Sequence, residues 1–263
     1  MSSCYKFIPL KYTNNILFEA VDATFIIHLE NNGRLERVMQ QLETFHPTRQ
    51  VYILFNKGYK KCKKADYIKI PPHDLVDAFL TCLREAERQK LGNVLILEDD
   101  FFFADDTSSY SKDVDTFLKE HKDESFVYYL GIIPYIQYPY DFTSYRNVIS
   151  SGSHANIYSP IFRKEILGAK QQDIEDWDIY LNFHATKYSY WKPLCFQLFP
   201  ETENSKHWMD TFGGATILKC IFKIFGLDKS VEPGYTFFYA FSKAMFFILL
   251  FLFIFGCIMI IKE

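Results

Sequence analysis

The sequence predicts an α/β domain with a mostly parallel central sheet, followed by a C-terminal transmembrane helix. Short apolar runs, of the type buried on both faces of a parallel sheet, alternate with segments of helical periodicity. One of these runs, Val94–Leu97, leads directly into three consecutive acids. The chain also ends on an uncharged apolar stretch, residues 244–261, that is long enough to cross a bilayer.

Size and composition set the broad class of protein. A chain of 263 residues suits one large domain, or one domain with an appendage. Apolar residues make up 49% of the chain, which is ample for a sizeable core. The net charge of −3 gives no sign of broad electrostatic binding, so we expect no nucleic-acid partner. The six cysteines form no CxxC pair, and we interpret them as reduced thiols in a cytosolic setting.

The first half of the chain has the order of a βαβ fold. Residues 1–20 are interpreted as a lead-in without an element of their own. Beyond them we expect strands at 23–29, 51–55, 67–70 and 94–97, a helix at 34–45, and a second helix capped by Asp74 and ended by Gly92. This order implies right-handed crossovers, which bring the carboxyl ends of the strands to one edge of the sheet. Open α/β sheets bind ligands at that edge.

The second half is less regular. We expect a helix at 113–122, a strand at 125–130, a helix at 160–167 and an edge strand at 191–198. The proline- and tyrosine-rich stretch 132–145 has the composition of a functional loop. Residues 216–227 form a basic amphipathic pattern, which predicts a helix that either lies on a bilayer surface or packs on the domain.

The C-terminal stretch Ala244–Ile261 predicts a membrane anchor. Its 18 residues would span about 27 Å as a helix, and Lys243 and Lys262 flank it as interfacial anchors do. A buried core helix is the alternative, but a helix that is apolar all round is hard to bury in so small a domain. We therefore divide the chain into a domain at 1–212, an amphipathic linker at 213–234 and an anchor at 235–263. No signal peptide is visible in residues 1–15, and so short a tail would be inserted after translation, so we expect residues 1 to about 230 to face the cytosol.

Two acid clusters are candidates for chemistry. Glu98, Asp99 and Asp100 follow the strand at 94–97, and Asp176 and Asp178 belong to a second cluster. Clustered carboxylates repel one another, and a cation between them relieves the repulsion. Oxygen ligands suit Mg²⁺ or Mn²⁺, which are commonly shared with a substrate phosphate. The alternative for the first cluster is an acidic turn that caps the next element.

The order of several short motifs resembles glycosyltransferase family 25, in the branch encoded by large DNA viruses. The similar segments cover about residues 22–208. They are Phe25–Glu30 with Arg34, Leu95–Asp100, Leu130–Gly131, Gly152–Tyr158, Asp176–Asp178, Lys192–Gln197 and Phe199–Ser205. The chain departs from the bacterial members of that family at Pro72–Ala78, where they carry a Gly-Cys-x-x-Ser-His segment.

The resemblance implies a GT-A-type nucleotide-sugar-binding fold and a metal-dependent sugar transfer. The donor would be a UDP-sugar, the acceptor a glycan, a protein or a lipid, and the transfer would invert the sugar. The resemblance also implies a location: the membrane of a host cell or of a virion of a large DNA virus. A membrane-anchored interaction protein that keeps this fold but has lost turnover is the alternative.

The resemblance also assigns roles to single residues. A cation held by Glu98 and Asp100 would stabilise the departing diphosphate, with His207 as a third ligand. Arg34 would meet the nucleotide diphosphate, His154 would touch the sugar or a phosphate, and Asp99 would bind the ribose or orient the metal ligands. The alternatives are a solvated arginine at a helix start for Arg34 and a structural histidine for His154.

Inversion needs a base for the acceptor hydroxyl, and Asp178 and Asp176 are the candidates. On one helix they would point about 160–200° apart, so only one of them would face the site. Asp178 is favoured if Trp177 and Tyr180 pack inward or line the acceptor pocket.

Overall fold

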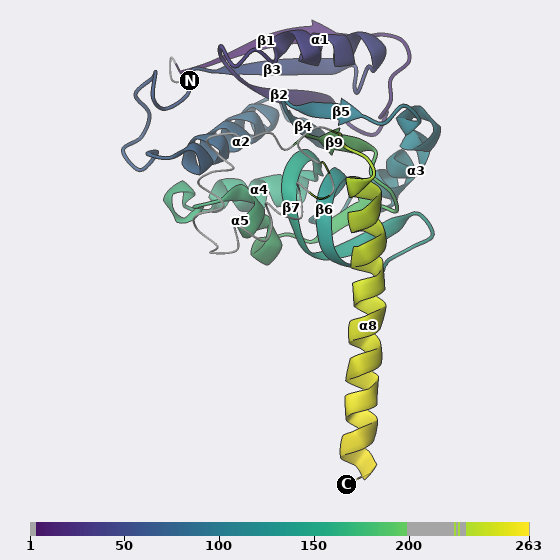
Figure 1. Ribbon diagram of the computed structural model, residues 1–263. Coiled ribbons are helices and arrows are strands. Elements are labelled where there is room, and N and C mark those ends of the chain that lie inside the picture. The colour runs from purple at the N-terminus through teal and green to yellow at the C-terminus, as the bar shows by residue number, and fades with distance from the viewer. Residues whose placement is uncertain (1–3, 199–223, 225, 227–229, 263) are drawn as a thin grey trace.

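The protein forms an α/β domain from which one long helix extends (Figure 1). The computed structural model describes residues 4–198, 224, 226 and 230–262. Within these residues, seven strands form the main sheet in the spatial order β1-β3-β2-β4-β7-β6-β8. Their bounds are Tyr5–Lys11 (β1), Ala23–Leu29 (β2), Gln50–Asn56 (β3), Val94–Glu98 (β4), Val127–Pro139 (β6), Ser144–Tyr158 (β7) and Lys187–Tyr190 (β8).

Most strands of this sheet run in one direction. Strand β2 is parallel to β3 and to β4, and β6 is parallel to β8. Both β4 and β6 are antiparallel to β7, so β4 and β6 share a direction. Only β1 and β7 run the opposite way among the described strands of this sheet. The predicted fold class, an α/β fold with a mostly parallel sheet and a C-terminal apolar helix, is confirmed.

Helices cover both faces of the sheet. On one face α2 (Pro71–Arg88), α4 (Pro160–Gly168) and α5 (Trp177–His184) share a core with Phe25 and Ile27 of β2. On the other face α1 (Leu35–Thr44) and α3 (Thr107–Glu120) share a core with Ile26. Successive side chains of a strand point to opposite faces, so a strand between two helical layers is apolar at nearly every position. A short 3₁₀ helix, Gln171–Asp173, precedes α5.

The prediction of a strand at 67–70 is wrong. That segment is irregular, and α2 begins at Pro71 rather than at a cap on Asp74. Two adjacent prolines are compatible with the first turn of a helix, where backbone N–H groups have no partner within the helix. Asp74 lies inside α2 instead, where it pairs with the buried Lys64 and accepts a hydrogen bond from Asn56.

Several stretches without an expected element belong to the main sheet, including those that form β7 and β8. The lead-in contains β1, an edge strand antiparallel to β3. The stretch 132–145 mostly continues β6, which forms a long hairpin with β7, so its interpretation as a loop is wrong. The β6–β7 register shifts near Pro134, and such irregularities accommodate proline within a sheet. The expected helix at 216–227 lies almost wholly outside the described residues.

A second, two-stranded sheet consists of β5 (Phe101–Phe103) and β9 (Cys195–Gln197). Strand β9 falls within the edge strand expected at 191–198, but it pairs with β5 rather than with the main sheet. Since β5 directly follows the first acid cluster, this small sheet lies beside the end of β4.

A disulfide joins Cys4, just before β1, to Cys62 in the segment between β3 and α2. The expectation that all six cysteines are reduced is therefore wrong for this pair. The two residues are 58 positions apart, so their spacing gave no sign of the bond. Cys82 and Cys195 are buried free thiols.

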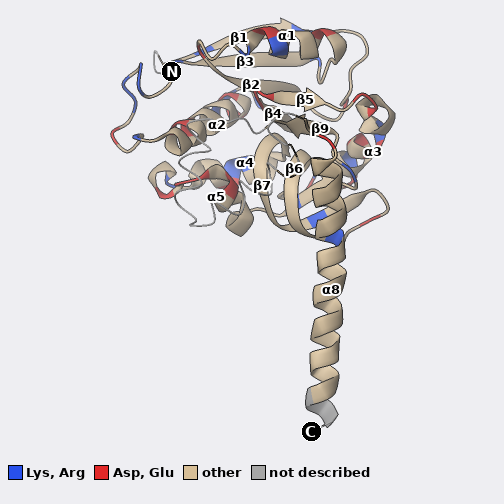
Figure 2. Cartoon of the chain, viewed as in Figure 1, with Lys and Arg blue, Asp and Glu red and all other residues tan. Residues whose placement is uncertain are grey.

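Helix α8 (Gly234–Lys262) begins against the domain and then extends away from it (Figure 1). Tyr235, Phe238 and Tyr239 are buried in the domain core, whereas the side chains from Phe247 to Phe255 are exposed and apolar. The stretch Gly234–Met259 is long and apolar enough to cross a membrane. Figure 2 shows no charged residue on the extended part of the helix before its grey last turn.

Candidate active site

The first acid cluster lies at the end of the central strand β4. Leu95, Ile96 and Leu97 are fully buried, and Glu98 ends the strand opposite Ile27 of β2. Asp99 and Asp100 form the turn that leads into β5. The carboxyl ends of β2 and β4 therefore share one edge of the sheet, as the βαβ order predicted.

Asp99 holds the segment that connects β2 to α1. Its carboxylate accepts hydrogen bonds from His28 Nδ1 at 2.8 Å, Leu29 N at 3.1 Å and Asn32 Nδ2 at 2.6 Å. Arg34 Nη1 also donates to it at 3.0 Å. Burial opposes ionisation, but these donors outweigh it and lower the pKa of Asp99. Asp99 is therefore an ionised carboxylate whose hydrogen bonds are directed at the protein.

Arg34 links Asp99 to Asp100. The same Nη1 atom lies 2.8 Å from Asp100 Oδ2, and Gln197 Nε2 of β9 donates to Asp100 Oδ1 at 2.9 Å. The Asp100 side chain is 7% exposed and that of Arg34 is 25% exposed. Burial raises the pKa of Asp100 although the charge of Arg34 opposes the shift. Asp100 is therefore held less firmly in its ionised form than Asp99.

Glu98 differs from both aspartates. In the described part of the chain its carboxyl accepts no hydrogen bond. Burial raises its pKa well above the usual value, and the charges of Asp100 and Asp178 raise it further. A carboxyl in this position takes up either a proton or a cation.

The second acid cluster comes from the start of α5. Asp178, in the first turn, accepts hydrogen bonds from Gly152 N at 2.7 Å and Ser153 N at 3.0 Å, and from the Ser153 hydroxyl. These bonds attach α5 to β7, the strand next to β4. The charge of Asp178 raises the pKa of Glu98, so the two acid clusters are close enough to interact electrostatically.

Asp176 is the N-cap of α5 rather than a helical residue. Its Oδ1 accepts a hydrogen bond from Ile179 N at 3.0 Å. The helical angle between Asp176 and Asp178 therefore does not apply, because only Asp178 lies in the helix. Burial and, second, the charge of Asp178 raise the pKa of Asp176 to about 6. Trp177 packs inward and stacks on Phe79 with ring centroids 4.7 Å apart.

His154 is enclosed by protein. Its ring is fully buried, with Nδ1 at 2.7 Å from Gly152 O and Nε2 at 3.3 Å from Cys195 O. Burial lowers its pKa to about 4, so the ring is neutral at physiological pH. Gly131 makes this packing possible, because a Cβ at that position would collide with the Cys195 carbonyl and the His154 ring. The assignment of His154 to donor binding stays a prediction, and His207 lies outside the described residues.

Several polar residues of the site had no assigned role in the sequence analysis. His28 and Gln197 bind the aspartates, and Asn32 positions the segment beside them. Lys187 of β8 is buried, donates to Val148 O at 2.9 Å, and has its pKa lowered by burial to about 8. The only local sign of these roles in the sequence was His28, a single histidine in the apolar run Ala23–Leu29.

The donor set available for a metal consists of two acids. Among the described residues, no group of three or more His, Cys, Asp or Glu side chains is arranged to hold a metal ion. Asp99 is engaged by protein donors, which leaves Glu98 and Asp100. Two carboxylates fit the way Mg²⁺ binds when substrate phosphates and water complete its coordination.

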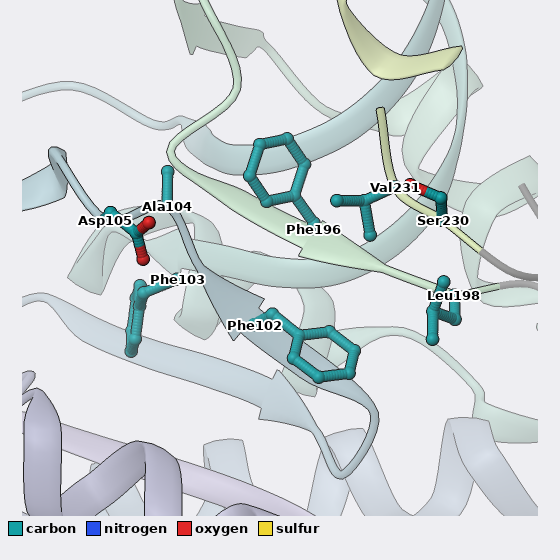
Figure 3. A pocket seen from close by; sticks show the side chains of 8 residues that line it. All are labelled: Phe102, Phe103, Ala104, Asp105, Phe196, Leu198, Ser230 and Val231. Carbon is teal, nitrogen blue, oxygen red and sulfur yellow. The ribbon is translucent and has the colours of Figure 1, made fainter. Parts of the chain in front are cut away.

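An apolar pocket of about 400 Å³ lies beside this site (Figure 3). Phe102 of β5 and Phe196 of β9 are paired across the two-stranded sheet, and both line the pocket. Val231, shortly before α8, lines it as well. Arg37 of α1 lies 4.5 Å from the centre of the Phe102 ring. The pocket therefore offers aromatic surface within a few residues of Asp100.

Comparison with protein-family models gives no match, and comparison with curated protein sequences gives none either. Solved structures that match part of this chain include a protein described as mannose-1-phosphate geranyltransferase from Thermus thermophilus, with 15% identity and a TM-score of 0.40 over 65% of this chain and 73% of that one. A197 from STIV has 11% identity and a TM-score of 0.43 over 70% of this chain and 87% of its own. An apo UDP-glucose pyrophosphorylase has 12% identity and a TM-score of 0.33 over 64% and 72% of the two chains. Likeness at this level assigns neither a family nor an activity to the chain.

Proposed function

We propose that the protein is a membrane-anchored glycosyltransferase that moves a sugar from a UDP-sugar to a glycan, protein or lipid acceptor with inversion. One observation carries the proposal. At the end of the central strand Asp100 is buried and Glu98 is partly buried, and the charge of Asp178 in α5 raises the pKa of Glu98. A site with acids on two sides suits a reaction in which one group binds the leaving diphosphate and another accepts a proton. The motif resemblance to glycosyltransferase family 25 supports the same reaction.

On the donor side, Glu98 and Asp100 would hold Mn²⁺ or Mg²⁺ together with the UDP diphosphate. The raised pKa of Glu98, with no hydrogen-bond donor to it among the described residues, supports its role as a cation ligand. A cation there supplies positive charge to the diphosphate as it departs. Arg34 is partly exposed and would contact the diphosphate oxygens.

Asp99 would position this site rather than contact the donor. It holds the β2–α1 segment and the Arg34 side chain, as its four hydrogen bonds indicate. Preorganisation of this kind keeps charged groups oriented toward the charge that develops during the reaction.

On the acceptor side, the choice of base lies between Asp176 and Asp178. The charge of Asp178 acts on Glu98, but the Asp178 carboxylate already accepts three hydrogen bonds. Asp176, with a pKa of about 6, has the basicity that general-base catalysis near neutral pH requires. Replacing each residue in turn with asparagine separates the two roles.

The test is release of UDP by the full chain in detergent, with Mn²⁺ and a panel of UDP-sugars. We expect Glu98→Gln and Asp100→Asn each to lower turnover by about 100-fold or more, the usual effect of removing a group that stabilises transition-state charge. Glu120→Gln, at an exposed position on α3, is the matched control and should retain full activity. Equal turnover in all four proteins would contradict the proposal.

An interaction protein without turnover is the alternative, and one observation favours it. Arg34 already donates hydrogen bonds to both Asp99 and Asp100, so part of the acid cluster is satisfied by the protein itself. A protein of this kind would show no metal-dependent increase in melting temperature with any UDP-sugar, and no UDP release.

For the location, we propose that α8 anchors the protein as a single-pass C-terminal helix, with the domain on the cytosolic face of a host-cell or virion membrane. The length and apolar surface of α8 support the anchor. The viral setting depends on the motif resemblance alone. The Cys4–Cys62 disulfide is more typical of an oxidising compartment, so the redox state of that pair in cells tests the orientation.

A further inference from the structure

The turn between β6 and β7 is tied to α8 where the helix leaves the domain. Gln137 of β6 accepts a hydrogen bond from Ser242 Oγ at 3.0 Å, and the Tyr138 ring lies 5.4 Å from that of Phe246. These contacts place the end of β6 beside the last part of α8 that touches the domain.

Trp191 completes the connection. Its backbone N–H donates to Thr143 O in the turn at 2.8 Å. Its carbonyl oxygen accepts a hydrogen bond from Lys243 Nζ of α8 at 2.5 Å. Lys243 also lies 4.4 Å from the centre of the Tyr145 ring. The turn, Trp191 and Lys243 therefore form one continuous surface, which we call the collar: Tyr140–Thr143, Trp191 and Lys243.

The collar exposes aromatic surface, although Tyr140 also hydrogen-bonds to His121 and Trp191 also packs on Tyr190. Phe142 is fully exposed, and Tyr140 and Trp191 are 45% and 41% exposed. The turn has a defined shape, because Asp141 Oδ1 accepts hydrogen bonds from Thr143 N at 2.7 Å and Ser144 N at 2.6 Å. It therefore presents Phe142 outward from a fixed backbone.

We propose that the collar docks on the surface of the membrane that α8 enters, in the headgroup layer of the bilayer. Lys243 is the last charged residue before the uncharged stretch 244–261, which is the position of an interfacial lysine. Tyrosine and tryptophan prefer the same layer, because their rings are apolar and their polar groups remain hydrated. Because the collar is bonded to α8 at this position, it reaches the headgroups whenever α8 spans the bilayer.

Docking fixes the height of the candidate active site above the membrane. Gln197 donates to Asp100 and, through its backbone N–H, to Tyr235 Oη at 3.0 Å, so the acid cluster lies near the level of Tyr235. Tyr235 precedes Lys243 by eight residues, which is about 12 Å along a helix. If the protein has the function proposed above, its acceptors are carried at the membrane surface, as lipid headgroups or membrane-borne glycans are.

The test uses the full chain in lipid nanodiscs with an environment-sensitive NBD label at one cysteine. Cys220→Ser and Cys257→Ser remove competing thiols, since Cys82 and Cys195 are buried and Cys4 is bonded to Cys62. The label is placed at Phe142→Cys in the collar, at Glu43→Cys as an exposed control on α1, and at Phe251→Cys on the extended part of α8. Helix α1 lies on the side of the domain opposite to the exit of α8 (Figure 1).

We expect dithionite in the aqueous phase to reduce the label at residue 142 about tenfold more slowly than the label at residue 43, which corresponds to a preference of about 1.4 kcal/mol for the headgroup layer over water. The label at residue 251 should be protected most. Protection at 251 with equal rates at 142 and 43 would overturn the docking while the anchor stands. No protection at 251 would overturn both.

A second copy of the chain covering the collar is the competing outcome. Nanodiscs that hold a single copy decide this, because protection at residue 142 then persists only if the bilayer provides it. Loss of protection in such discs would overturn the proposal. The measurement does not involve UDP-sugar turnover, so failure of the proposed enzyme activity leaves its result unaffected.

Discussion

Asp176 has two roles that one substitution separates. Its Oδ1 caps α5 by accepting a hydrogen bond from Ile179 N. Burial and the charge of Asp178 raise its pKa from 3.8 to about 6. Asparagine caps helices as well as aspartate does. Asp176→Asn therefore keeps the cap and removes a buried charge.

The expected gain in stability follows from the pKa. A shift of roughly two units costs the folded state about 3 kcal/mol once the carboxyl is ionised. The attraction between the carboxylate and the helix N-terminus is already contained in this net shift, whereas burying the new amide group takes back about 1 kcal/mol. We therefore expect Asp176→Asn to raise the free energy of unfolding by about 2 kcal/mol when the wild-type residue is charged.

The direction of the pH dependence is fixed by the same shift. The pKa in the folded state lies above the unfolded value, so Asp176 is harder to ionise in the folded protein. Below pH 3.8 the carboxyl is protonated in both states, and the substitution has little effect. As the pH rises from 3.8 to about 6, the free energy of unfolding of the wild-type protein falls relative to that of Asp176→Asn. Above that range the full difference has developed.

Urea unfolding of the full chain in detergent, followed by tryptophan fluorescence at pH 4 and pH 8, measures the effect. We expect a small difference between wild type and Asp176→Asn at pH 4 and about 2 kcal/mol in favour of the variant at pH 8. Asp178→Asn is the matched control and should lose about 2 kcal/mol, because its new amide would face the N–H groups of Gly152 and Ser153. The same stability difference for Asp176→Asn at both pH values would refute the argument.

Three further substitutions test other parts of the structure. Replacing Cys4 and Cys62 together with serine should lower the free energy of unfolding by about 4 kcal/mol, the chain-entropy value for a 58-residue separation, and reductant should then no longer affect the urea midpoint; an unchanged midpoint would mean that the disulfide is absent. Gly131→Ala should cost about 3 kcal/mol or prevent folding, since its methyl group meets the Cys195 carbonyl, whereas Gly168→Ala, which has open space, should be nearly neutral in the same assay. Glu98→Gln should leave the metal-free protein at least as stable as wild type at pH 7, because burial raises the pKa of Glu98. The same substitution should abolish any rise in melting temperature that Mn²⁺ with UDP produces. A preserved rise would remove Glu98 from the site.

The sequence predicted those parts of the fold that local pattern determines. The runs that became β2 and β4 are apolar because helices cover both sides of them, and this is visible in any short window of sequence. Strand β1 was missed because an edge strand is only half-buried, and its pairing with β3 is made across some forty residues. The stretch 132–145 was misinterpreted because its prolines and tyrosines suggest a loop, whereas register shifts allow the sheet to accept them.

The candidate site was also only partly predictable from the sequence. The position of Glu98, Asp99 and Asp100 could be predicted because they follow a buried strand in the sequence. Their partners could not, because Gln197 comes from a different sheet and His28 from a different strand. The role of Asp176 as a helix cap was also hidden, because it depends on where α5 begins.

The Arg34 contacts bear on the choice between an enzyme and a protein without turnover. One Nη1 atom serves both aspartates, but the two bonds are not equivalent. Asp99 has a lowered pKa and three further donors, so it retains Arg34, whereas Asp100 has a raised pKa and is the weaker partner. A diphosphate with its cation would therefore displace Arg34 from Asp100 while Asp99 still holds it at the edge of the site. The arginine would then be free to donate to phosphate oxygens, and the closed arrangement is compatible with a resting state that opens when the donor binds.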